Sequence, residues 1–113
     1  MTEPERWKKV SKFFKDNFSD GEEIDIDGML FLIGVQELGI GKKKFKKDEK
    51  VNLMHVAVCR ILEPYGYYRF DGKDADGWPQ FELISELPDL KSNEQTLLMN
   101  KAIILYFEEQ GLI

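Results

Sequence analysis

One stretch constrains the fold more than any other part of the sequence. It is residues 51 to 62, Val-Asn-Leu-Met-His-Val-Ala-Val-Cys-Arg-Ile-Leu. At the helical spacing of 100° per residue, six apolar side chains share one broad face: Ala57, Ile61, Met54, Val58, Val51 and Leu62. Leu53 and Val56 lie on the other side, so little of the cylinder remains to face water. The pattern predicts a central, largely buried helix over about residues 47 to 63, ended by Pro64.

Chain length and composition provide the material for a core around this helix. The chain has 113 residues, of which 42% are hydrophobic, and it carries 8 Phe and 2 Trp. A chain of this size buries about two thirds of its unfolded surface on folding. We therefore expect a single domain over residues 1–113 that folds without stabilisation by a disulfide or a metal.

The single cysteine, Cys59, excludes an internal disulfide and any cysteine-based metal site within one chain. A reduced, cytoplasmic setting follows from this cysteine usage. The N-terminal residues lack the basic-then-apolar pattern of a secretory signal, and the longest purely apolar run is Met29 to Ile33. We expect no contact with a membrane.

Three more helices are indicated by apolar periodicity and by start and stop residues. The first, over about 3 to 17, begins at a Thr2 and Glu5 capping box and buries an aromatic stripe. The second, over about 28 to 38, has Asp27 as its expected N-cap and Gly39 as its stop.

The last helix is predicted over about 93 to 110. A second capping box, formed by Ser92 and Gln95, precedes it. Gly111 followed by Leu112 predicts a Schellman motif in which Leu112 reaches Phe107.

Two strand-like runs, 67–70 and 81–84, are separated by an Asp- and Gly-rich stretch and predict a β-hairpin. The order is therefore helix, helix, helix, hairpin, helix, an α+β fold of mainly helical content. This order resembles that of winged-helix domains, in which the third helix enters the major groove of DNA. The exposed wedge of the central helix carries Asn52, Arg60, Glu63 and Glu49, with Val56 among them. Such a surface is poorly suited to contact phosphates and base edges, which disfavours nucleic acid as the partner of this helix.

Charge is unevenly distributed in this chain of net charge −5. Residues 42 to 50 hold six lysines against two acids, and helix 3–17 is also basic. These segments offer candidate anion-binding residues: Lys42, Lys43, Lys44, Lys46, Lys47, Lys8 and Lys12. The alternative is a solvated loop that balances the acidic segments elsewhere.

The hairpin tip holds Asp71, Asp74 and Asp76 beside two glycines and raises the question of a calcium site. An EF-hand loop requires oxygen ligands at alternating positions and a glutamate at the twelfth. Counting from Asp71 places Lys73 and Ala75 at ligand positions, so the spacing favours a simple Asp- and Gly-rich turn. We expect no metal and no cofactor.

Enzymatic activity has no positive signal in the sequence. His55 and Cys59 lie four residues apart on one helix face and form a conceivable nucleophile pair. A thiol in apolar surroundings is inert, however, and no phosphate-binding, dinucleotide or nucleophile-elbow motif occurs. We expect no catalytic residue.

Apolar surface is the more informative feature, because three helices carry apolar residues around nearly their whole circumference. One small domain buries a single such helix completely, and burying three requires further cover. The predicted partner contacts combine hairpin aromatics with residues of the last helix: Trp78, Tyr67, Met99, Tyr106 and Ile103. The sequence thus favours a non-enzymatic protein acting through protein–protein contact, with a homo-oligomer or another protein as partner. The alternative hypothesis is a winged-helix-like protein that binds nucleic acid or another anion.

Overall fold

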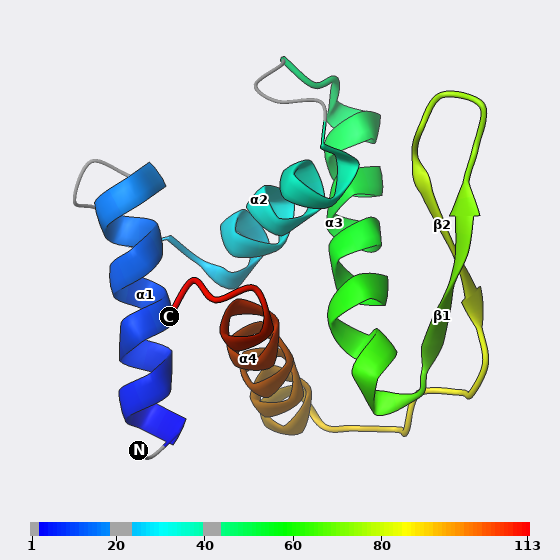
Figure 1. Ribbon diagram of the computed structural model, residues 1–113. Coiled ribbons are helices and arrows are strands. Elements are labelled where there is room, and N and C mark those ends of the chain that lie inside the picture. The colour runs from blue at the N-terminus through cyan, green and yellow to red at the C-terminus, as the bar shows by residue number, and fades with distance from the viewer. Residues whose placement is uncertain (1–2, 19–23, 40–43) are drawn as a thin grey trace. The chain divides into compact units, whose positions relative to one another are not determined.

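The computed structural model describes residues 3–18, 24–39 and 44–113 (Figure 1). Its elements follow the order helix, helix, helix, hairpin, helix, which confirms the predicted α+β, mainly helical fold. The chain groups into two compact units, Asp25–Leu87 and Met1–Ile24 with Pro88–Ile113, and each is described by itself.

The Asp25–Leu87 unit begins with α2 (Ile26–Leu38). Asp25 is the N-cap, and its carboxylate accepts a hydrogen bond of 2.8 Å from the Gly28 N–H. The prediction of Asp27 as N-cap was wrong by two residues, because both aspartates precede the same apolar run. Gly39 adopts φ 76° and donates to the Val35 carbonyl at 3.1 Å, which confirms the predicted stop.

The next helix, α3 (Lys47–Leu62), packs against α2 at unusually short range. A Cβ added to Gly34 of α2 would lie 2.1 Å from the carbonyl oxygen of Leu53. Glycine is therefore the residue that lets the two helix backbones meet here. The buried cluster at this junction consists of Leu38, Phe45 and Leu53, with Phe31, Val35 and Trp78 partly buried against it.

The faces of α3 differ from the single stripe that periodicity predicts. Leu53 and Val56, expected on the less covered side, are both buried, whereas Val51, expected on the apolar face, is 62% exposed. The reason is visible in Figure 1, where α3 lies between α2 and the hairpin and is covered from two directions.

After a short 3₁₀ turn (Glu63–Tyr65), strands β1 (Tyr68–Lys73) and β2 (Pro79–Leu83) form an antiparallel hairpin. Tyr68 pairs with Leu83 and Phe70 with Phe81, so these four side chains share one face. We call these four residues the apolar hairpin face. The strands extend beyond the predicted runs because an irregularity between Phe70 and Lys73 lets β1 continue.

The second unit contains α1 (Glu3–Phe18) and α4 (Ser92–Glu109). The rings of Phe13 and Phe14 lie 5.3 and 5.1 Å from that of Phe107, and Arg6 forms an ion pair with Glu108. These contacts bear out the aromatic stripe expected for the first helix.

The ends of α4 confirm one prediction and shift another. The N–H of Leu112 donates to the Phe107 carbonyl at 2.9 Å and that of Gly111 to the Glu108 carbonyl at 3.1 Å, the hydrogen bonds of a Schellman motif. At the start, Glu94 accepts from the N–H of Lys91, the N-cap, so the predicted Ser92 capping box was one residue late. The predicted Thr2 capping box lies outside the described residues.

Candidate functional site

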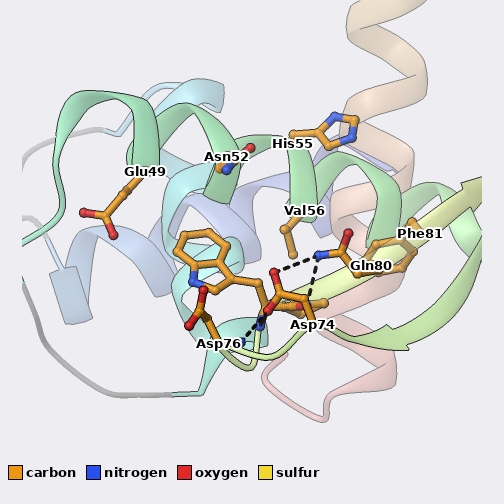
Figure 2. A pocket seen from close by; sticks show the side chains of 10 residues that line it. Glu49, Asn52, His55, Val56, Asp74, Asp76, Gln80 and Phe81 are labelled. Atoms are coloured by element: carbon orange, nitrogen blue, oxygen red, sulfur yellow. Dashed lines mark hydrogen bonds between the residues drawn. The ribbon is translucent and has the colours of Figure 1, made fainter.

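A pocket of about 490 Å³ lies in the Asp25–Leu87 unit, between α3 and the hairpin (Figure 2). The lining residues come from one face of α3, from the hairpin loop and from β2: Glu49, Asn52, His55, Val56, Asp74, Asp76, Trp78, Pro79, Gln80 and Phe81. A cavity of this size is in the range of pockets that bind ligands.

The α3 wall is built by helical spacing. Glu49, Asn52 and His55 are three residues apart and project from the same side of the helix, as Figure 2 shows. Glu49 also caps α3, because its carboxylate accepts a hydrogen bond of 2.9 Å from the Lys46 N–H. The central helix thus presents a polar wall on the side where the hairpin lies.

The hairpin wall is organised by Asp74. Its Oδ1 accepts hydrogen bonds from the backbone N–H groups of Asp76 (3.0 Å) and Trp78 (2.9 Å), and its Oδ2 accepts one from Gln80 Nε2 at 3.4 Å. Aspartate is favoured in such turns because its side chain accepts hydrogen bonds from backbone N–H groups of the same turn. The prediction of an Asp- and Gly-rich turn describes this tip, and among the described residues no group of three or more His, Cys, Asp or Glu side chains is arranged to hold a metal.

The pocket is acidic. Glu49, Asp74 and Asp76 supply three carboxylates, and its lining contains neither lysine nor arginine. Trp78 adds an aromatic side chain, which attracts cations to its face. This combination suits a positively charged group and repels phosphate.

The His55 and Cys59 pair lies next to this wall. Cys59 Sγ is 3.5 Å from His55 Nε2, and the thiol is buried. Burial raises the pKa of Cys59 to about 11, so the thiol stays protonated at neutral pH and is a weak nucleophile. Burial, followed by the charge of the Cys59 thiolate, also raises the pKa of Tyr68 above its usual value.

The predicted anion-binding lysines are divided between the two units. Lys44, Lys46 and Lys47 are exposed at the start of α3. Lys8 and Lys12 are exposed on α1, where Lys12 contacts Asp16 at 2.6 Å. Lys42 and Lys43 lie outside the described residues.

The predicted partner contacts stay predictions, and the structure gives only their exposure. Trp78, Tyr67 and Met99 are half-buried, and Trp78 packs against the Leu38, Phe45 and Leu53 cluster. Ile103 and Tyr106 are 0% and 2% exposed. Apolar residues around a helix indicate an excess of apolar surface, but they do not show which side chains are covered.

Apolar residues of the hairpin region are exposed in the structure, and none of them is among the predicted site residues. Phe70 is 47% exposed, Leu83 53% and Ile84 57%. Alternation within each run places Tyr68 with Phe70 and Phe81 with Leu83, so part of the signal is present in the sequence. The cross-strand register and the exposure of Phe70 and Leu83 come from the structure.

Comparisons with protein-family models, with curated proteins and with solved structures found no match to this chain. The likeness to winged-helix domains therefore rests on element order alone. Within the described residues, no helix is both long and apolar enough to cross a membrane.

Proposed function

We propose that this chain is a non-enzymatic protein that acts through protein–protein contact, with self-association as its simplest form. The observation that supports this is the exposed part of the apolar hairpin face, where Phe70 and Leu83 are about half exposed. Exposed apolar side chains that lie together are typical of surfaces that a partner covers.

Self-association is the simplest form because every copy carries the same face. A two-fold interface joins identical patches, so it requires one self-complementary surface and no second component. The net charge of −5 opposes close approach of two copies, which predicts a weak, concentration-dependent dimer. We place the protein in the cytoplasm because its one cysteine, Cys59, is a free, buried thiol.

Light scattering coupled to size-exclusion chromatography tests this form of contact. For the wild-type chain we expect a mass that rises with concentration from 13.2 kDa toward twice that value. Phe70→Lys, which places a charge on the exposed apolar face, should remain monomeric. Ser85→Lys adds the same charge at an exposed position nearby and serves as the matched control. A strictly monomeric wild type at high concentration would contradict self-association.

The second candidate function is binding of nucleic acid or another anion by Lys8, Lys12 and the lysine run. The exposure of Lys44, Lys46 and Lys47 favours it, whereas the acidic pocket on α3 disfavours phosphate at that helix. A true nucleic-acid binder loses affinity steeply as salt rises. Absence of any binding to duplex or single-stranded DNA at low salt would eliminate this candidate.

A further inference from the structure

The hairpin has one open edge, on β2. The N–H of Ile84 donates to the Tyr67 carbonyl at 2.9 Å, which fixes residue 84 as a position that faces β1. Backbone N–H groups alternate in direction along a strand, so those of Phe81 and Leu83 point away from β1. The sheet has two strands, and within the described part of the chain neither of these N–H groups has a hydrogen-bond partner.

The β1 edge is partly occupied. The N–H of Phe70, which points outward from β1, donates to Glu63 Oε2 at 2.8 Å. A side-chain acceptor at this position removes one donor that an incoming strand would use. Strand addition at β1 is therefore disfavoured relative to β2.

The acidic pocket adjoins the open edge. Its lining includes three consecutive β2 residues, Pro79, Gln80 and Phe81, and none from β1, all of whose residues are described. The opposite wall is the polar face of α3. A segment paired with β2 would lie about 4.8 Å from it and would send alternate side chains into a space walled by helix and strand.

The charges around this edge select the segment. Glu49 and Asp76 contribute carboxylates to the pocket, and Glu82 lies between the two outward-facing N–H positions. Glu82 forms an ion pair with Arg69 of β1, so the carboxylates that favour a basic incoming residue are those of the pocket. Trp78, in the same lining, offers its ring to a cation held there.

We infer that the open edge of β2 and the pocket beside it bind an extended segment of another protein that carries lysine or arginine, by strand addition. This inference rests on the proposed function and names the chemistry of the partner. A second copy fits this edge less well. Residues 79–84 of a second copy include no lysine or arginine to place in the acidic pocket.

An NMR titration of the full chain with the acetylated, amidated peptide Lys-Val-Lys-Val-Lys-Val tests this. We expect the largest amide shifts at Phe81 and Leu83. Only one alternate set of peptide N–H groups can face β2. N-methylation of that set should abolish binding, and N-methylation of the other set should leave binding intact. The same peptide with glutamate in place of lysine should not bind.

Variants of the protein test the charge requirement. Glu49→Gln combined with Asp76→Asn should weaken peptide binding about tenfold while keeping a side-chain acceptor at the α3 cap. Asp71→Asn removes a carboxylate that does not line the pocket and should leave affinity unchanged. Leu83→Pro, which removes one outward N–H and no β1–β2 bond, should weaken binding further.

Three outcomes would overturn the inference. The first is that millimolar peptide causes no amide chemical-shift changes. The second is that N-methylation of either alternate set of peptide residues has the same effect. The third is that a peptide copying residues 79–84 binds more tightly, which would identify a second copy as the occupant. Phe70→Lys separates this inference from the proposed function, because Phe70 lies on β1 and its N–H is already bonded to Glu63. If that variant abolishes self-association while no peptide binds, only the strand-addition inference fails.

Discussion

The two sides of α3 are covered in opposite ways. Toward α2, the backbones approach so closely that a Cβ on Gly34 would lie 2.1 Å from the Leu53 carbonyl oxygen. Toward the hairpin, a pocket of about 490 Å³ with polar walls remains. The first contact has no space for a ligand, and the second has both space and charge.

This difference separates stability from binding within a single helix. Leu53 is fully buried in the apolar cluster near α2, whereas its neighbour Asn52 is exposed and lines the pocket. Adjacent residues of α3 thus serve different purposes. Substitutions toward α2 should change the free energy of unfolding most, and substitutions of the exposed α3 residues in the pocket wall should change it little.

Gly34→Ala should have the largest effect. The new methyl group overlaps backbone atoms of α3, which have no side-chain freedom to move aside, so the helices must separate. We expect a loss of about 3 kcal/mol in the free energy of unfolding, at the upper end of overpacking costs. Urea denaturation followed by circular dichroism measures it.

Gln36→Ala provides the matched control for this prediction. Gln36 is exposed on the same helix, two residues from Gly34. Its replacement by a better helix former should change stability by less than about 0.5 kcal/mol. If Gly34→Ala were equally neutral, the close approach of the two helices would be wrong.

Asp74→Ala should have an intermediate effect, on the hairpin side. It removes the acceptor for the N–H groups of Asp76 and Trp78 and should cost about 2 kcal/mol, since hydrogen bonds to a charged group are lost. Asp71→Ala, at an exposed position outside the pocket, should be close to neutral. Equal urea midpoints for the two variants would show that Asp74 does not hold the hairpin tip.

Much of the fold could be predicted because its elements are locally encoded. Apolar periodicity and the glycine stops at Gly39 and Gly111 located the helices to within about two residues, which is the usual precision of element ends. Alternation within each strand placed Tyr68 with Phe70 and Phe81 with Leu83, and the register then joined the two pairs into one face.

The candidate site was less accessible from sequence because it depends on packing between elements. The spacing of Glu49, Asn52 and His55 indicates a polar helix face, but not that a hairpin lies beside it. Val56 was assigned to an exposed wedge for this reason, although it is buried. The open edge of β2 likewise requires the strand register, which the sequence alone did not supply.

The smallest effect should come from Cys59, a buried thiol near the otherwise polar wall. Its folded pKa is about 11, above the ordinary value of 9.0. Because the folded chain favours the protonated thiol, this group's contribution to stability is complete below about pH 9 and is lost as pH rises toward 11. The difference in urea midpoint between wild type and Cys59→Ala should therefore shrink between pH 9 and 11. Titrating groups other than Tyr68, whose pKa the Cys59 thiolate raises, should affect both chains alike. The native thiol should also resist iodoacetamide at pH 7.5 until urea unfolds the chain. Rapid alkylation of the native protein, or a difference in midpoint that does not vary with pH, would mean that the hairpin side of α3 is open to solvent at Cys59 as well as at the pocket.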